Sequence, residues 1–164
     1  MNHDPPVIPL DRHCQVIAFE KYGIWAFEKA PGVLTHPNKG RSDKQKSRTL
    51  LNAAYLEDEE AYSWEDEKGC KNKLYLVHRL DSPTSGVILG TSSKDLAASI
   101  KDSFANRKVS KTYHAIVIPS RKSFKNAHWK DNLIEKRNQG KIRVTRGNGP
   151  IAITKAYMER EKTG

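Results

Sequence analysis

The chain has 164 residues, of which 37% are hydrophobic and 29% charged, so it can form one domain with a modest core. No run approaches the roughly 18 apolar residues of a membrane span, and the first residues lack the pattern of a signal peptide, so we expect a cytoplasmic protein without a membrane partner. The net charge of +10 is uneven: residues 1–82 carry 12 basic and 13 acidic side chains, and residues 83–164 carry 17 and 6.

The first expected segment is a polar, proline-rich lead-in over residues 1–13, and residues 14–164 are expected to form one domain. Two short β-prone runs at 15–19 and 24–27 are separated by Lys-Tyr-Gly, which predicts a hairpin. The run Ala-Pro-Gly at 30–32 predicts a turn after it.

Residues 47–55 predict a short helix, because Leu50, Leu51 and Ala54 would share one side of it. Residues 57–67 contain seven acidic side chains and predict a solvated loop. A functional role for this acidic segment, such as docking a basic partner, is the alternative.

A strand is expected over residues 74–80, followed by a turn over 82–86 and a return strand over 87–90. The clearest helix comes next, with Ser92 or Ser93 as its N-cap and Asp95 in its first turn. One side of this helix would be apolar, with hydrophobic residues four positions apart: Leu96, Ile100 and Phe104.

Three further strands are expected, over residues 111–118, 141–144 and 151–158, joined by basic loops. Together these elements predict an α+β fold with a mixed, largely antiparallel sheet and flanking helices.

Arg79 and Asp81 would share one face of the strand that begins at Leu74, about 6.6 Å apart, with His78 on the other face. A neighbouring arginine favours the ionised aspartate, and an ionised carboxylate can act as a nucleophile or a base. The alternative is structural, namely a surface ion pair and a turn cap, because Asp-Ser-Pro is common in turns.

Lys111 and Tyr113 would share a face of the strand over residues 111–118. A tyrosine can stack on a nucleobase, and its hydroxyl can handle a proton. The alternative is an ordinary core or edge tyrosine. The basic second half predicts a polyanion partner, with a merely soluble basic surface as the alternative.

Residues 78–86 read His-Arg-Leu-Asp-Ser-Pro-Thr-Ser-Gly, which resembles the signature His-Arg-Leu-Asp-x-x-Thr-Ser-Gly of the RluA-type pseudouridine synthases at all seven fixed positions. Upstream, residues 29–37 are similar to the family's Lys-Pro-x-Gly segment that ends in His-Pro, although Ala and Pro are exchanged here. Downstream, Lys-x-Tyr-x-Ala-x-Val at 111–117 is similar to the family's next motif. The resemblance runs from about Val16 to about Tyr157.

The family isomerises particular uridines in RNA to pseudouridine: the base is detached from its N1 bond, rotated and rejoined through C5. The resemblance implies that Asp81 is the catalytic nucleophile or base. It also implies that Arg79 helps to extrude the uridine, as flipping requires, and that Tyr113 stacks on the flipped uracil.

The resemblance further implies substrate-binding roles for Lys111 and for the turn that presents Asp81, formed by Thr84, Ser85 and Gly86. The implied partner is structured rRNA or tRNA, and a monomer is expected. The implied chemistry needs no cofactor or metal. Cys14 and Cys70 are too few and too far apart for a structural zinc site, so we expect two reduced thiols.

Family members continue past the strand that is similar to residues 151–158, and they include a Gln-Ile-Arg segment that helps to position the aspartate. The chain is therefore expected to lack the C-terminal part of the catalytic domain. Two other functions stay open: a truncated, non-catalytic paralogue that binds RNA, and a hydrolase that uses Asp81 with His78 or His114. The predicted strand argues against the hydrolase, because it places His78 behind Asp81.

Overall fold

The computed structural model describes residues 7–38, 48–117, 126–138 and 141–159. The chain forms two compact units, Met1–Lys111 and Thr112–Gly164, and we describe each by itself. No helix in the described ranges is long and apolar enough to cross a membrane.

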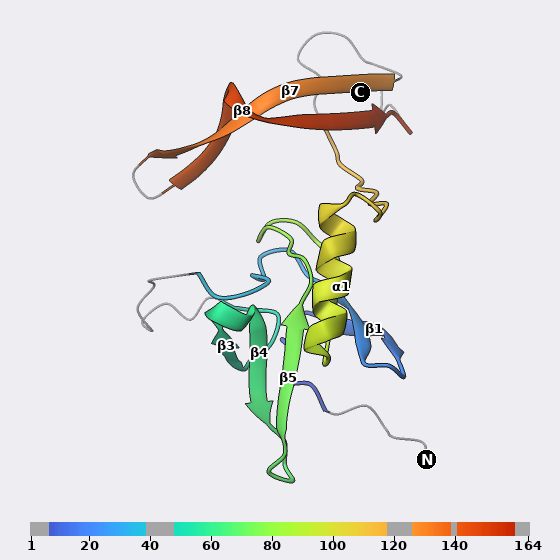
Figure 1. Cartoon of the computed structure of the whole chain (residues 1–164), viewed down its shortest axis with the longest axis vertical. Coiled ribbons are helices and arrows are strands. Elements are labelled where there is room, and N and C mark those ends of the chain that lie inside the picture. The colour runs from blue at the N-terminus through green and yellow to red at the C-terminus, as the bar shows by residue number, and fades with distance from the viewer. Residues whose placement is uncertain (1–6, 39–47, 118–125, 139–140, 160–164) are drawn as a thin grey trace. The chain divides into compact units, whose positions relative to one another are not determined.

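The first unit contains a six-stranded sheet in the order β1-β2-β6-β5-β4-β3, in which every pairing is antiparallel. A short 3₁₀ helix, η1 (Glu57–Glu59), lies between β3 and β4, and α1 (Lys94–Ala105) follows β6. Figure 1 shows β4 beside β5 and α1 running along β5. The strands are β1 (Gln15–Glu20), β2 (Ile24–Lys29), β3 (Ala54–Leu56), β4 (Ala61–Glu65), β5 (Lys71–Leu76) and β6 (Gly86–Thr91).

Both faces of β5 are buried. Leu74 and Leu76 belong to a cluster on one face that also contains Phe27. Tyr75 and Val77 belong to a second cluster on the other face, where α1 packs. Successive side chains of a strand point to opposite faces, so the sheet has a core on each side. Because β5 is held on both faces, it positions the turn that follows it firmly.

Helix α1 begins where the sequence predicts, since the Ser93 Oγ accepts a hydrogen bond from the Leu96 N–H at 3.3 Å. Ile100 and Phe104 pack against the second cluster as expected, whereas the most deeply buried helical residue is Ala97. The α+β class, the largely antiparallel sheet and the first hairpin are confirmed, with α1 as the helix on the sheet.

The short helix expected over residues 47–55 is wrong for the part that the structure describes. Leu50 and Leu51 are both fully buried as expected, but they are not in a helix. The segment is extended instead: Leu51 bridges Leu10, and the Leu50 N–H donates to the Leu34 carbonyl at 2.8 Å. The expected loose lead-in therefore reaches the core at Leu10.

The solvated loop expected over residues 57–67 is also wrong. Its middle is β4, which lies between β3 and β5 and buries Ala61 and Tyr62 completely. The acidic residues gather at the two ends of the strand, in η1 and in the turn at residues 66–69. The sequence pattern did not reveal this strand, because it has only two buried residues and many acidic neighbours.

The strand expected over residues 74–80 starts earlier and stops at Leu76, so residues 77–81 are irregular. In the second unit, β7 (Asn126–Asn138) and β8 (Lys141–Tyr157) form a long antiparallel hairpin, seen as two adjacent ribbons in Figure 1. The two strands expected at 141–144 and 151–158 are thus one strand. Of the strand expected over residues 111–118, residues 111–117 have no regular structure, and residue 118 lies outside the described residues.

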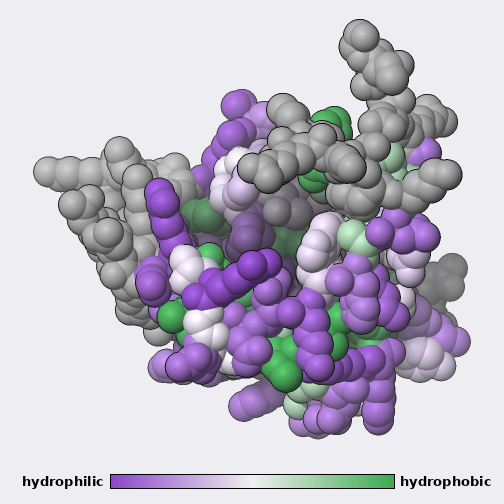
Figure 2. Space-filling view, turned by 90° about the horizontal axis from the view of Figure 1, so that it is seen from above, coloured by the Kyte–Doolittle hydropathy of each residue, from purple (hydrophilic) through white to green (hydrophobic). Residues whose placement is uncertain are grey.

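Among the coloured residues of Figure 2, hydrophilic ones predominate, and hydrophobic ones form smaller patches between them. This surface agrees with the high charge of the chain. Within the described residues, Cys14 is buried and Cys70 is exposed, and both thiols are free, as expected.

Candidate active site

Asp81 lies on an exposed turn between β5 and β6, the two central strands of the six-stranded sheet. The Thr84 N–H donates to the Asp81 carbonyl at 3.0 Å and closes the turn. Gly86 follows with a φ of 131°, a conformation that residues with a Cβ rarely adopt. The glycine at this position is therefore needed by the backbone that returns from the turn to β6.

Thr35 holds the residue that precedes Asp81. Its Oγ1 donates to the Leu80 carbonyl at 2.7 Å and accepts from the Leu80 N–H at 3.0 Å. Thr35 is only 3% exposed, and its own carbonyl accepts from the buried Tyr62 hydroxyl at 2.8 Å. The backbone next to Asp81 is thus fixed from inside the first core cluster.

Lys29 provides a second support below the turn, although it is completely buried. Its Nζ donates to the carbonyls of Val33 at 2.7 Å, Ala30 at 3.1 Å and Ser82 at 3.3 Å. The Ser82 carbonyl also accepts from the Gly32 N–H at 2.7 Å. The segment that follows β2 is therefore joined to the turn just after Asp81.

The charge of Lys29 matters to the site as well. Burial lowers the pKa of Lys29, whereas electrostatic interactions with Cys14 and Asp81 raise it. The ammonium group and the Asp81 carboxylate therefore attract each other across the turn.

Arg79 and Asp81 are both exposed, but they do not form the ion pair that the sequence suggested; none joins them in the described part of the chain. The separation of about 6.6 Å expected for two residues on one face of a strand does not apply to Arg79 and Asp81, because β5 ends before them, at Leu76. Arg79 instead lines a pocket of about 210 Å³ together with Tyr55 and Lys101.

His78 is partly buried and serves the fold. Its Nε2 accepts from the Leu89 N–H at 3.0 Å, and its ring lies 5.0 Å from that of Phe104. Burial, and then the charge of Lys111, lower the pKa of His78, while a hydrogen bond to the Arg79 backbone raises it. These contacts agree with the structural role expected for His78 and leave the hydrolase pairing without support from this residue.

The other predicted site residues divide between the two units. Thr84, Ser85 and Gly86 share the turn with Asp81. The Lys111 Nζ lies 5.5 Å from the Phe104 ring centroid, at the end of the first unit. Tyr113 belongs to the second unit and is 60% exposed.

His114 also belongs to the second unit, where its Nδ1 lies 3.4 Å from Glu159 Oε2. Among the described residues there is no group of three or more His, Cys, Asp or Glu that could hold a metal ion.

Sequence reasoning missed the supporting roles of Lys29, Thr35 and Tyr62. Lys29 had a visible signal, since it is a lysine in the β-prone segment that precedes the Ala-Pro-Gly turn. Thr35 had none, because its partner Leu80 is 45 residues away along the chain.

Comparison with known proteins gives one family and several relatives. The family described as RNA pseudouridylate synthase matches residues 23–162. The tRNA pseudouridine synthase C of Yersinia pestis is 50% identical over 44 residues, which are 27% of this chain and 17% of that protein. The enzyme of the same name from Vibrio cholerae is 33% identical over 101 residues, or 62% of this chain and 36% of that protein.

A third relative, the ribosomal large subunit pseudouridine synthase D of Xylella fastidiosa, is 30% identical over 114 residues, or 70% of this chain and 30% of that protein. The chain thus spans between 17% and 36% of the length of these three relatives. Because the family match covers most of the chain and includes the whole turn around Asp81, this chain belongs to the RluA-type family of RNA pseudouridine synthases.

Proposed function

We propose that this chain carries the catalytic turn of an RNA uridine isomerase, with the Asp81 carboxylate as the nucleophile or base. The observation that carries the proposal is an exposed carboxylate on a turn whose backbone is held at Leu80 by Thr35 and at Ser82 by Lys29. A reacting group gains rate when it is held ready before substrate arrives, because little reorganisation is then needed.

The remaining roles follow from chemistry and from the family to which the chain belongs. Arg79 is exposed beside the turn and would help to hold the strand from which the uridine is extruded. Tyr113 would stack on the flipped uracil and handle a proton at C5, and Lys111 would contact a phosphate. Thr84 and Ser85 would shape the turn. The isomerisation involves no net oxidation and no transfer to another molecule, and the proposal assigns it no cofactor.

The proposed substrate is a structured tRNA or rRNA in the cytoplasm. The names of the relatives refer to tRNA and to the large ribosomal subunit. Residues 83–164 carry 17 basic and 6 acidic side chains, a balance that suits a phosphate backbone. The proposed form in solution is a monomer.

The test is conversion of uridine in tRNA and rRNA that lack pseudouridine, read by carbodiimide labelling or by mass shift after labelling. Conversion is expected with the wild-type chain and should vanish in Asp81→Asn, which keeps the size of the side chain but removes its charge. Asp102→Asn, on the exposed side of α1, is the matched control and should convert RNA like the wild type. Equal conversion by Asp81→Asn would overturn the proposal.

RNA binding without catalysis is the second candidate. It is favoured by a group of exposed cations just after α1, namely Arg107, Lys108 and Lys111. Phosphate contacts of this kind bind RNA regardless of any chemistry, and their affinity falls as salt rises. Salt-dependent binding of RNA with no conversion by the wild-type chain would favour this candidate.

A further inference from the structure

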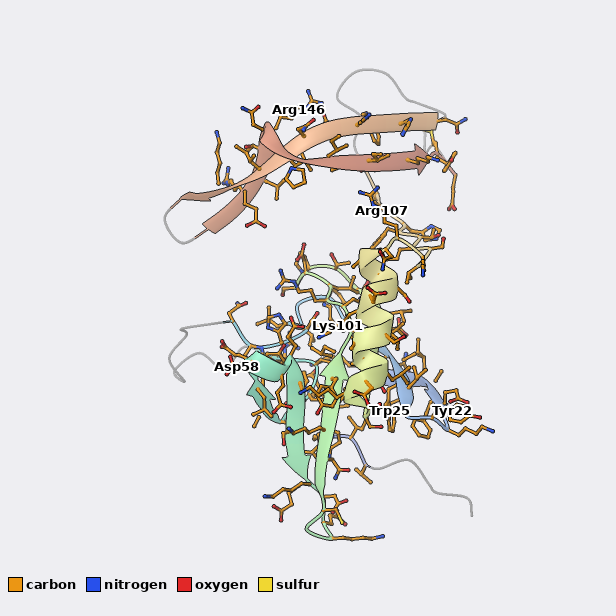
Figure 3. All side chains as sticks on the ribbon, viewed as in Figure 1. Tyr22, Trp25, Asp58, Lys101, Arg107 and Arg146 are labelled. Atoms are coloured by element: carbon orange, nitrogen blue, oxygen red, sulfur yellow. The ribbon has the colours of Figure 1, made fainter. Side chains whose placement is uncertain are left out.

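A pocket of about 210 Å³ in the first unit lies beside the Asp81 turn, and Asp81 itself is not part of its lining. Its lining includes His36, Tyr55 of β3, Glu60 just before β4, Arg79 and Lys101 of α1. Figure 3 labels Lys101 on α1 and Asp58 in η1, the short helix that precedes the pocket residue Glu60. Of the residues that have a role in the proposed function, Arg79 alone lines this pocket.

Two of the lining residues form an aromatic platform. The rings of His36 and Tyr55 are stacked, with an interplanar angle of 11° and centroids 5.1 Å apart. Tyr62, which is fully buried, braces Tyr55 edge-on at 5.1 Å. The His36 Nδ1 donates to the Pro37 carbonyl at 2.9 Å, which fixes the orientation of the imidazole. Fixed aromatic rings of this kind are the surfaces on which unpaired RNA bases stack.

The polar lining supplies both signs of charge. Glu60 and Lys101 form an ion pair in which both side chains remain partly exposed. A carboxylate offers about four lone-pair sites, so Glu60 can accept further hydrogen bonds while it pairs with Lys101. Arg79 and Lys101 can attract a phosphate. Burial, and then the charges of Glu60 and Glu57, raise the pKa of Tyr55, so its hydroxyl stays protonated and able to donate.

Glu60 also has an unusual backbone, with φ 50° and ψ 44° in the left-handed region. A glycine or asparagine would adopt this conformation at lower cost, so the backbone gives no reason for a glutamate here. We therefore look for a function of the Glu60 side chain.

We propose that this pocket binds a nucleotide of the RNA close to the target uridine, and that it prefers a base with an exocyclic amino group. The inference rests on the proposed function. Arg79 links the two places, because it lines the pocket and precedes Asp81 by two residues, at most about 7 Å of chain. One short stretch of RNA can then occupy both the pocket and the turn.

The preference for an amino group follows from the carboxylate. Adenine, cytosine and guanine can donate from an exocyclic amino group to Glu60. Uracil presents carbonyl oxygens on both sides of its ring N–H, and these oxygens repel a carboxylate. The base would stack on the outer face of the His36–Tyr55 pair, with its phosphate toward Arg79 and Lys101.

The experiment titrates AMP, CMP, UMP and ribose 5-phosphate into the ¹⁵N-labelled full chain and follows the backbone amide signals by NMR. AMP and CMP are expected to shift the signals of His36, Tyr55, Glu60 and Lys101, and to bind about tenfold more tightly than UMP. Ribose 5-phosphate should shift them much less, because it has no base to stack.

Two variants and one control sharpen the result. Glu60→Gln should remove the preference for AMP and CMP over UMP, and Tyr55→Leu should weaken all three by about tenfold. Glu59→Gln is the matched control, because Glu59 pairs with Lys73 at 2.8 Å and does not line the pocket. It should keep the wild-type preference. If Tyr55→Leu does not fold, Glu60→Gln decides the question alone.

Equal binding of ribose 5-phosphate and AMP would overturn the inference, and so would equal binding of AMP and UMP or shifts confined to other residues. The outcome is separable from that of the proposed function, because Asp81→Asn should retain nucleotide binding while it loses RNA conversion. Conversion by a wild-type chain that binds none of the nucleotides would overturn the pocket alone. Nucleotide binding with the expected preference but no conversion would overturn the proposed function alone.

Discussion

Thr35 satisfies both backbone polar groups of Leu80, since its Oγ1 donates to the Leu80 carbonyl at 2.7 Å and accepts from the Leu80 N–H at 3.0 Å. A single hydroxyl can do both because it is a donor and an acceptor at once. The relationship spans 45 residues of sequence and ends one residue before Asp81. It gives an irregular segment the hydrogen bonds that a strand partner would otherwise supply.

Thr35→Val should therefore damage both the fold and the turn. Valine has nearly the same shape but leaves the N–H and carbonyl of Leu80 without partners, which should lower the free energy of unfolding by about 2 kcal/mol. RNA conversion should fall more through kcat than through RNA affinity, because Asp81 loses its fixed position. Urea unfolding and steady-state kinetics measure the two effects.

Thr35→Ser retains the hydroxyl and should recover most of the activity. Thr91→Val is the control for stability alone, because the Thr91 Oγ1 accepts from the Ser93 N–H at 3.1 Å, at the start of α1 rather than at the turn. Similar losses of kcat in Thr35→Val and Thr91→Val would contradict a positioning role for Thr35.

Lys29→Met should destabilise the first unit by about 2 kcal/mol, because three carbonyls lose a shared donor inside the protein. The turn at Ser82 should loosen as well, and RNA conversion should fall. Lys21→Met is the matched control, since Lys21 is exposed in the β1–β2 turn and should unfold at the wild-type urea concentration. Identical midpoints for the two variants would show that the buried amine contributes nothing.

The stability of the chain should fall on acidification because of His78. Its pKa is lowered in the folded state, so the unfolded chain binds the proton more readily. The stability that neutral His78 contributes is full above the unfolded pKa of about 6.5 and is lost as the pH falls below it, through the lowered folded value. Protonation also removes the Nε2 acceptor of the Leu89 N–H.

His78→Gln offers an acceptor that does not titrate, so its thermal midpoint should fall less than that of the wild type between about pH 7.5 and pH 5. The difference between the two proteins should be constant above about pH 7.5, which serves as the internal control. Parallel curves over the whole range would contradict the contribution of His78.

Gly86→Ala and Gly90→Ala should both destabilise the chain by more than about 1 kcal/mol, for different reasons. At Gly86 the φ of 131° is the cause, since an added Cβ would meet Leu80 only at an ordinary 3.8 Å. At Gly90 the cause is space, because the Cβ would lie 3.0 Å from the Leu74 Cγ. In a Leu74→Ala background, the effect of Gly90→Ala should shrink while that of Gly86→Ala stays the same, as a double-mutant cycle by urea unfolding would show.

Local patterns predicted the elements whose cause is local. The hairpin of β1 and β2, the turn at residues 82–86, the start of β6 and the N-terminus of α1 each follow from turn residues, alternation or a capping serine. The family resemblance rested on the letters of residues 78–86, and the family match over residues 23–162 confirmed it. The roles of Asp81, Arg79 and Tyr113 stay predictions.

The errors arose where distant partners outweigh local preference. Residues 48–53 look helical by spacing, yet their backbone pairs with residues 10 and 34, and Leu50 and Leu51 enter one core together. The acidic segment was expected to be a loop, but its middle forms β4, because β3 and β5 pair with it on both sides. The end of the strand expected over residues 74–80, and the described part of the strand expected over residues 111–118, remain irregular.

The order of residues was enough to name the family and to single out Asp81, because the signature and its turn chemistry are contiguous in the chain. What holds that aspartate in place came from the fold: the Thr35 hydroxyl on Leu80, the buried Lys29 under Ser82, and the turning of His78 toward Leu89. Each is a hydrogen bond between segments that only the packed sheet brings together. The alternation of side chains within one strand cannot predict these hydrogen bonds, because it says nothing about the segments that pack against the strand.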